Sequence, residues 1–354
     1  MKLFTCQHCG QMLYFENTAC ERCGRALGFL PDLGVLSALE LDGSEWRALA
    51  ARGAVYRPCA NVVHGTCNWQ VSASEDANYC VACRHNRTVP DLSIAGNLER
   101  WRKLEVAKHR LFYTLLKLRL PHPTKCEDET RSLAFDFLAD PTDDQTPRVM
   151  TGHDNGLITV ALAEADDVEL ERRRTELGEP YRTLLGHMRH EVGHYYWDRL
   201  IADTGAFDGF RVLFGDERED YGEALKRYYE LDPTDNWSDS YVSAYARAHP
   251  WEDWAETWTH YLHIVDSLET AQAFRLRVDP KAGRIGDLSS EVDFDAYAAV
   301  PIGTIVDAWL PLSFAINSLN RSMGLKDAYP FVLSSGVIEK LGFVHRTVHG
   351  PGRA

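Results

Sequence analysis

His190, Glu191 and His194 form a His-Glu-x-x-His segment, whose residue types and spacing suit metal-assisted hydrolysis. On a helix, positions i and i+4 project from one face, so both imidazoles can reach a single Zn²⁺. Glu191 then lies beside the ion, where its carboxylate can accept a proton from an attacking water. We therefore interpret the two histidines as ligands of a catalytic zinc and Glu191 as a general base.

The flanking sequence predicts a buried helix over about 179–202. Pro180 suits its first turn, and apolar residues recur at helical spacing on both sides of the motif. Buried polar groups need partners, and a metal ion is the simplest partner for two histidines and a glutamate. The alternative is a surface helix that carries two unrelated histidines.

A third zinc ligand must come from elsewhere, because no His follows His194 at the spacing that metzincins use. The best candidate is Glu252, in a helix predicted to begin near Pro250. Glu256 follows one turn later on the same face and would accept a hydrogen bond from a ligand histidine. Asp253 and Glu256 are the rival ligands.

A tetrahedral oxyanion also needs a hydrogen-bond donor, and two tyrosines precede the second helix. Tyr245 lies about two helical turns before Glu252 and is the preferred candidate. Tyr241, His249 and His260 are alternatives. Ordinary packing tyrosines would give the same pattern.

The segments 186–197 and 249–258 resemble those of gluzincin metallopeptidases. They resemble more closely a bacterial family of zinc-binding metallopeptidases that carry an N-terminal zinc ribbon, and this resemblance spans nearly the whole chain. It implies that His190, His194 and Glu252 bind the metal and that Glu191 is the general base. It implies a reaction class, peptide-bond hydrolysis, and no particular substrate.

The chain departs from thermolysin-like enzymes at two points. The gap between His194 and Glu252 is longer, and Glu256 stands where those enzymes have Asp.

Two C-x-x-C knuckles, Cys6–Cys9 and Cys20–Cys23, are separated by ten residues and are each followed by glycine. Paired knuckles at this separation are typical of zinc ribbons. The N-terminus does not resemble a signal peptide, and a cytosolic setting favours thiolate–metal bonds over disulfides. We therefore expect residues 1–30 to form a ribbon around a structural zinc.

A second set of cysteines consists of Cys59, Cys67, Cys80 and Cys83. We expect it to bind a second structural zinc within residues 31–92, with His64 as a possible substitute ligand. The alternative is a set of unrelated reduced thiols. Cys126 belongs to neither set and is expected to be a buried thiol.

The composition is that of a globular protein, with 45% hydrophobic and 25% charged residues and a net charge of −14. A negative net charge does not favour binding to the phosphates of nucleic acid. Docking to a protein partner is therefore the expected use of the ribbons. No apolar run stands out as a membrane span. We expect a cytoplasmic protein that acts on a peptide or protein substrate.

The predicted fold is α+β: a mainly helical, zincin-like (gluzincin) catalytic domain with a small sheet, over 93–354, preceded by the two zinc modules. Further helices are expected at 98–120, 218–230, 250–275, 302–323 and 335–348. Strands are expected at 55–60, 71–74, 132–138, 149–152 and 157–163, the last two joined by an Asn155-Gly156 turn. In the enzymes that the chain resembles, an edge strand borders the cleft and pairs with an extended peptide; if strand 157–162 is that edge, the substrate is a polypeptide backbone.

Two functions fit these patterns. The first is a cytosolic zinc metallopeptidase with one catalytic and two structural zinc ions. The second is a zinc-ribbon interaction protein whose peptidase-like domain binds a peptide or a partner without cleaving it.

Overall fold

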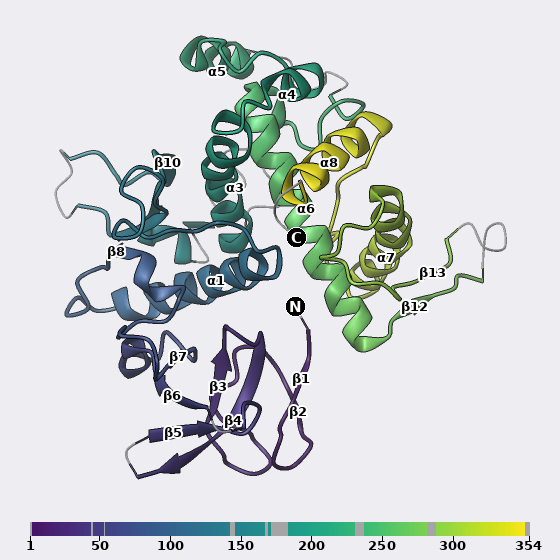
Figure 1. Ribbon diagram of the computed structural model, residues 1–354. Coiled ribbons are helices and arrows are strands. Elements are labelled where there is room, and N and C mark those ends of the chain that lie inside the picture. The colour runs from purple at the N-terminus through teal and green to yellow at the C-terminus, as the bar shows by residue number, and fades with distance from the viewer. Residues whose placement is uncertain are drawn as a thin grey trace. The chain divides into compact units, whose positions relative to one another are not determined.

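The computed structural model describes residues 2–43, 45–52, 54–141, 146–166, 169–170, 183–230, 237–281 and 288–350 of the 354-residue chain. The chain folds into two compact units, Met1–Met188 and Arg189–Ala354 (Figure 1). Helices and several small sheets give the α+β class that the sequence predicts, with a cysteine-rich ribbon region first. The division into 1–30, 31–92 and 93–354 stays a prediction.

The first unit begins with two small antiparallel sheets. In one, β1 (Phe4–Thr5) pairs with β2 (Met12–Leu13). The other follows chain order: β3 (Leu27–Leu30), β4 (Val35–Asp42), β5 (Glu45–Ala48), β6 (Val55–Pro58) and β7 (Gln70–Ser72). One of its buried clusters consists of Leu30, Leu39, Ala48 and Tyr56. Phe29 of β3 is also buried, between the rings of Phe15 and Trp69.

Helix α1 (Asn97–Lys117) is the long helix of the first unit, and it confirms the helix expected at 98–120. Its buried side chains recur at helical spacing: Trp101, Leu104, Leu111, Phe112 and Leu115. The helix packs against the short helix η3 (Leu162–Ala165). Because α1 is buried on several sides, some of its polar residues also lie inside the unit.

A four-stranded sheet lies in the same unit in the order β10 (Gly152–Asp154), β11 (Leu157–Ala161), β9 (Ala134–Leu138) and β8 (Asn86–Thr88). Asn155 and Gly156 both have positive φ, which confirms the tight turn between β10 and β11. The expectation that strand 157–162 forms an edge is wrong. β11 is hydrogen-bonded to β10 on one side and β9 on the other, so its backbone cannot accept a peptide strand.

The second unit is built around α6 (Pro250–Phe274), a helix buried along nearly its whole length (Figure 1). It packs against α4 (Phe207–Phe214), η5 (Tyr245–Arg247), α7 (Ile302–Ser322) and α8 (Ser335–Val348). Helix α3 (Leu184–Trp197) carries the His-Glu-x-x-His segment and continues as a π-helical turn, Asp198–Ala202. The predicted start of this helix, at 179–182, lies outside the described residues.

The remaining elements of the second unit are α5 (Tyr221–Glu230) and a small hairpin of β12 (Arg277–Val278) with β13 (Ser290–Glu291). The helices expected at 218–230, 250–275, 302–323 and 335–348 are therefore confirmed to within a few residues.

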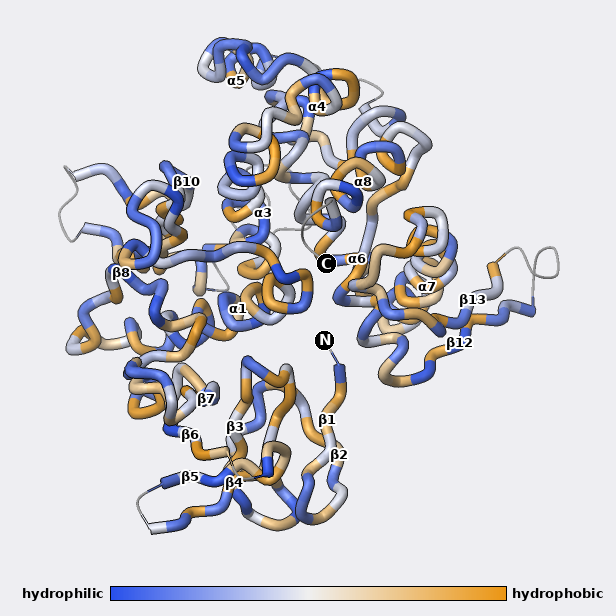
Figure 2. The backbone as a smooth tube through the Cα atoms, viewed as in Figure 1, coloured by the Kyte–Doolittle hydropathy of each residue, from blue (hydrophilic) through white to orange (hydrophobic). Residues whose placement is uncertain are grey.

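Helix α7 meets the length and composition required of a membrane-crossing helix, which the sequence analysis overlooked. Apolar residues recur along it (orange in Figure 2). The core helix of a globular protein passes the same test, and α7 packs against α6 and α8. Length and composition alone therefore decide nothing about a membrane.

Two expectations about exposure are also wrong. The sequence predicts a buried Cys126, but its thiol is exposed. The Gly-Pro-Gly stretch that follows and the lack of a nearby acid predict an exposed His345, but this residue is buried in α8. Its Nε2 donates to the Val300 carbonyl at 2.7 Å, and its Nδ1 lies 2.9 Å from the Tyr261 hydroxyl.

Candidate active site

Two helices of the second unit bring together the three atoms expected to hold a metal. His190 and His194 lie one turn apart on α3, and Glu252 lies in the first turn of α6. His190 Nε2 is 3.2 Å from His194 Nε2 and 2.9 Å from Glu252 Oε2. His194 Nε2 is 3.6 Å from the same carboxylate oxygen. All three side chains are buried.

These distances fit a tetrahedral metal site. With bonds of about 2.05 Å to nitrogen and oxygen, ligand atoms around zinc lie about 3.3 Å apart. The observed separations of 2.9–3.6 Å bracket that value. The three atoms form one triangular face, so a bound ion would keep a fourth position for another ligand, as catalytic zinc sites do.

The charges at the site also suit a cation. Burial opposes ionisation of Glu252, but His194 and His190 outweigh burial and hold the pKa of its carboxyl well below the usual range. For His190, burial is outweighed by the carboxylates of Glu252 and Glu256, which raise its pKa well above the usual value. A buried carboxylate facing two imidazoles is stabilised by positive charge between them.

Glu256 orients His190 and is not placed to bind the metal itself. His190 Nδ1 donates to Glu256 Oε1 at 2.7 Å, so in the neutral ring that would bind a metal the lone pair is on Nε2, the atom that faces Glu252. Ser243 fixes the other oxygen of Glu256 by donating from its hydroxyl at 2.6 Å. The orientation expected from the i and i+4 spacing of Glu252 and Glu256 is thus present.

Asp253, the other rival ligand, faces away from the three metal-binding atoms. Lys340 donates to its Oδ2 at 2.6 Å, and both side chains are buried. Burial nevertheless raises the pKa of Asp253 to about 7, against the pull of Lys340. The Lys340 ammonium also lies 4.3 Å from the ring centroid of Tyr241, so Tyr241 belongs to this ion pair and not to the metal site.

A close helix crossing positions the two halves of the site. A Cβ at Gly193 would lie 3.1 Å from the Cα of Ala255 and 3.1 Å from Cδ1 of Trp258, so only glycine lets α3 approach α6 here. Trp254 donates its indole hydrogen to the Gly193 carbonyl at 2.8 Å. The sequence analysis missed this role, although glycine inside a predicted buried helix is a signal for it.

Glu191 lies on α3 between the two histidines and is buried, with 6% of its surface exposed. Its charge is among those that raise the pKa of Tyr221, after burial and Glu252. Its position next to His190 in the chain and its burial beside the metal-binding atoms suit the predicted base.

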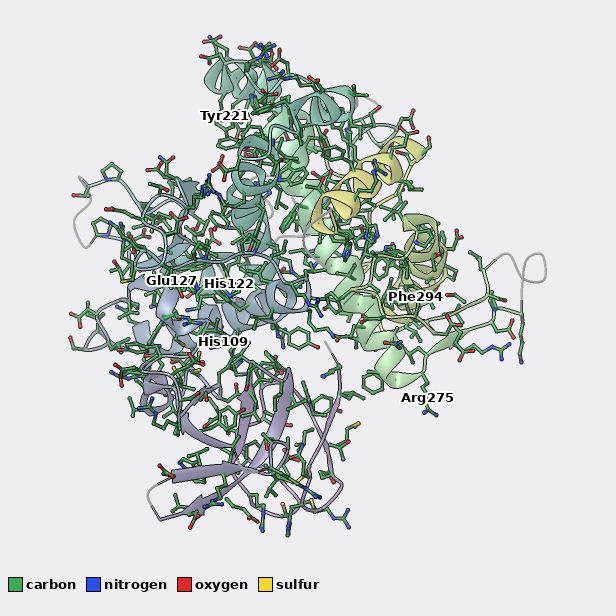
Figure 3. All side chains as sticks on the ribbon, viewed as in Figure 1. His109, His122, Glu127, Tyr221, Arg275 and Phe294 are labelled. Atoms are coloured by element: carbon green, nitrogen blue, oxygen red, sulfur yellow. The ribbon has the colours of Figure 1, made fainter. Side chains whose placement is uncertain are left out.

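Tyr221, at the start of α5, is a site residue that the sequence analysis missed (labelled in Figure 3). Its hydroxyl donates to Glu252 Oε1 at 2.9 Å, so it holds the carboxylate oxygen that does not face the histidines. The ring of Tyr245 lies 6.0 Å from that of His190, and Tyr221 is among the groups that, after burial and Glu252, raise the pKa of Tyr245. No spacing rule links Tyr221 to Glu252, so only the fold reveals the contact.

Replacing Tyr221 with Phe is expected to weaken zinc binding at this site about tenfold to a hundredfold, the usual effect of losing a residue that orients a metal ligand. Competition with a chromogenic chelator measures the affinity. Tyr229→Phe is the matched control, because Tyr229 lies on the same helix and is exposed. Equal affinities in the two variants would show that Tyr221 does not support Glu252.

His249 and His260, alternative oxyanion donors, are both engaged elsewhere. His249 caps α6: its Nδ1 accepts from the Trp251 N–H at 3.1 Å, and its Nε2 donates to the Glu219 carbonyl at 3.1 Å. His260 is buried, with Nδ1 2.8 Å from the Tyr329 hydroxyl. The hydroxyl of Tyr221 contacts Glu252, and the ring of Tyr245 lies 6.0 Å from that of His190, so these two tyrosines lie close to the candidate metal site.

A cleft of about 890 Å³ adjoins these tyrosines. The ring of Tyr228 lines it and contacts Tyr245, with centroids 5.8 Å apart. Phe214 and Gly215 form part of its wall. Two aromatic rings, those of Tyr228 and Tyr245, therefore lie between the cleft and His190.

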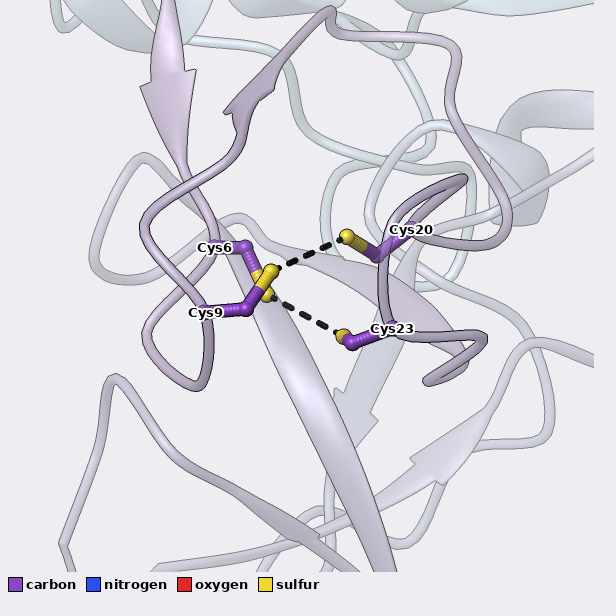
Figure 4. Close-up of side chains that lie close together, drawn as sticks. All are labelled: Cys6, Cys9, Cys20 and Cys23. Carbon is purple, nitrogen blue, oxygen red and sulfur yellow. Dashed lines mark hydrogen bonds between the residues drawn. The ribbon is translucent and has the colours of Figure 1, made fainter.

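The first cysteine cluster has the geometry of a zinc ribbon (Figure 4). Cys6 Sγ is 3.8 Å from Cys23 Sγ, and Cys9 Sγ is 3.6 Å from Cys20 Sγ. Four sulfurs at about 2.3 Å from zinc lie about 3.8 Å apart. The glycine after each knuckle has positive φ, as expected. A backbone hydrogen bond from Cys23 lowers the pKa of the Cys20 thiol to about 7, which favours the thiolate.

The second cluster also converges, although only one of its pairs is a C-x-x-C knuckle. The sulfurs of Cys59, Cys67, Cys80 and Cys83 lie within 4.8 Å of one another and are buried. His64 is not in this cluster; its ring packs against Trp101 instead, with centroids 5.7 Å apart. Another histidine, His109 of α1, does face these sulfurs, and the sequence analysis did not single it out.

Comparison with known proteins agrees with this geometry. Residues 97–347 match the model of a family described as "Putative zinc-binding metallo-peptidase", and residues 3–94 match a zinc-ribbon domain. The chain belongs to this metallo-peptidase family. Uncharacterized proteins of Mycobacterium bovis and of two strains of Mycobacterium tuberculosis are each 43% identical to it over 349 residues, which is 98% of this chain and 95% of theirs. No solved structure matches.

The metallo-peptidase family match begins at the first residue of α1 and ends within α8, so it includes every residue of the candidate metal site. Zinc is the metal that the family, the ribbon match and the cysteine clusters support. The number of bound ions and the role of each site residue are not decided by these matches.

Proposed function

We propose that this member of the metallo-peptidase family is a zinc-dependent peptidase of the gluzincin type. One observation carries the proposal: Nε2 of His190, Nε2 of His194 and Oε2 of Glu252 converge within 3.6 Å, with Glu191 between the two histidines on the same helix. Three protein ligands and an open fourth position are typical of hydrolytic zinc sites.

Each residue has a role in this mechanism. Bound zinc would supply the Lewis acidity that activates water and polarises the scissile carbonyl. Glu191 accepts the proton of the attacking water and returns it to the leaving amine. Glu256 holds the ring of His190, and Tyr221 holds the carboxylate of Glu252. Tyr245 is the proposed donor to the developing oxyanion, because its ring lies 6.0 Å from that of His190.

The test is cleavage of a mixed peptide library by the zinc-loaded full chain at neutral pH, with products identified by mass spectrometry. Cleavage should stop when a chelator removes zinc and return when zinc is restored. Peptide binding without any cleavage, in protein shown to carry zinc at His190, would instead support an interaction protein. A protein partner for the ribbons and a cytoplasmic location are further proposals from the sequence.

Replacing His190 with Ala should remove one zinc ion per chain. Three clusters of ligands among the described residues lead us to expect about three ions in the natural protein and about two in the variant. Metal analysis of the purified proteins measures this. His263→Ala is the control, since His263 is buried in α6 of the same unit but faces Arg189. An unchanged zinc content in His190→Ala would remove the catalytic site from consideration.

A further inference from the structure

Helix α1 places a group of fully buried polar side chains against the second cysteine cluster. Glu105, Lys108 and His109 come from this helix, which belongs to the metallo-peptidase match, whereas the cysteines belong to the ribbon match. Glu105 Oε2 lies 3.9 Å from Cys83 Sγ. The two regions therefore meet at the cluster, inside the first compact unit.

His109 faces three of the four sulfurs (labelled in Figure 3). Its Nε2 lies 3.3 Å from Cys67 Sγ, 3.6 Å from Cys83 Sγ and 4.0 Å from Cys80 Sγ. Its Nδ1 donates to the Glu105 carbonyl one turn earlier at 2.7 Å, because a carbonyl can only accept. This hydrogen bond fixes the direction of the ring, with Nε2 toward the sulfurs.

The four cysteines suffice to bind a tetrahedral ion. Cys67 Sγ and Cys80 Sγ lie 3.7 Å apart, the spacing expected around zinc. Backbone N–H groups donate to the sulfurs as they do in thiolate sites: Trp69 to Cys67, and Cys80 to Cys59, each at 3.3 Å. His109 is thus an additional group at an already complete set of ligands.

A buried zinc ion with four thiolates carries two negative charges, which are costly to bury unless hydrogen-bond donors face them. His109 is in position to donate from Nε2, since metal-bound thiolates can only accept. Both ring nitrogens then carry hydrogen, and the Glu105 carboxylate, 3.6 Å from Nδ1, favours the resulting positive charge.

Glu105 is itself held firmly. Lys108 donates to its Oε1 at 2.8 Å, Asn86 donates to the same oxygen at 2.7 Å, and the Trp101 indole donates at 3.1 Å. The ring of Trp69 packs on His109 with centroids 5.1 Å apart. The histidine is therefore held in place by the helix on one side and by the cysteine module on the other.

We propose that His109 is a positioning residue of the second zinc centre: it donates a hydrogen bond to the zinc-bound thiolates of Cys67 and Cys83. The centre thereby fastens the first helix of the peptidase region to the ribbon region. Helix α1 continues this link, because Lys103 donates to the Ala165 carbonyl of η3 at 3.2 Å. Metal binding at the cysteines and order in α1 are then coupled.

The test uses the full chain loaded with ¹¹³Cd in place of zinc. Cadmium resonances report directly on the sulfur ligands, and the first cysteine cluster in the same molecule is an internal reference. His109→Ala should shift the resonance of the second centre and leave the first unmoved. Loss of metal from the second centre to a chelator should become about tenfold to a hundredfold faster. Amides of α1 should exchange faster with solvent.

Two further variants sharpen the result. His109→Gln keeps an N–H donor and should restore part of the metal retention. His122→Ala is the matched control, since His122 packs on Phe112 of the same helix with centroids 5.9 Å apart and contacts none of the four sulfurs. An unmoved second resonance with unchanged metal loss in His109→Ala would overturn the proposal.

The natural protein provides a measurement that does not depend on whether a variant folds. With ¹⁵N-labelled histidine, Nε2 of His109 should carry a hydrogen that is coupled to cadmium through the sulfur. A bare Nε2 bonded directly to cadmium would make His109 a ligand, and this too would overturn the proposal.

Discussion

Glu191→Gln is expected to reduce peptide cleavage about a hundredfold to ten-thousandfold, the range that a positioned general base contributes. The amide keeps the size of the side chain but cannot accept the proton of the attacking water. Zinc content should not change, because Glu191 is not among the converging metal-binding atoms. Steady-state cleavage of the best library peptide and metal analysis of the same sample measure both quantities.

Glu256→Gln is the matched variant for this experiment. Glu256 accepts from His190 Nδ1, so its loss should weaken metal binding, and excess zinc should restore much of the cleavage. Added zinc should therefore restore cleavage in Glu256→Gln but not in Glu191→Gln. Cleavage by Glu191→Gln at the natural rate would rule out Glu191 as the base and would leave the gluzincin mechanism without support.

The sequence was informative where chemistry and helical spacing act together. His190 and His194 share a face because they are four residues apart, and Pro250 places Glu252 in the first turn of its helix. Polar groups on two buried helices need partners, and these groups can be partners for one another, so Glu252 could be chosen across a long gap. The structure places these atoms within 3.6 Å of one another.

The sequence was uninformative where a contact depends on tertiary packing alone. Tyr221 reaches Glu252 from a helix that has no fixed spacing to either metal-binding segment. His109 reaches the cysteines from a helix assigned to another domain. Asp253 looked like a rival ligand because its partner, Lys340, lies 87 residues further along the chain. Strand β11 was taken for an edge because pairing with β9 cannot be read from one strand.

Removal of metal from the first cysteine cluster is expected to unfold the segment around β1 and β2. These strands are two residues long, and the sulfurs of Cys6 and Cys20 are buried. Structural zinc contributes about 10–16 kcal/mol of apparent binding free energy at neutral pH, and a module of this size has little apolar burial to replace it. Cys20→Ser should therefore lose one zinc ion and become sensitive to protease near its N-terminus.

Cys126→Ser is the matched control for that variant, because Cys126 is an exposed thiol outside both clusters. It should keep its zinc content and its resistance to protease. Hydrogen exchange in the second unit gives an independent measurement. The amides of α6 should exchange with solvent equally slowly in both variants, because all the atoms of the candidate metal site lie within that unit. If Cys20→Ser kept an ordered N-terminal segment in strong chelator, apolar packing would be holding the ribbon, and its cysteines would require another explanation.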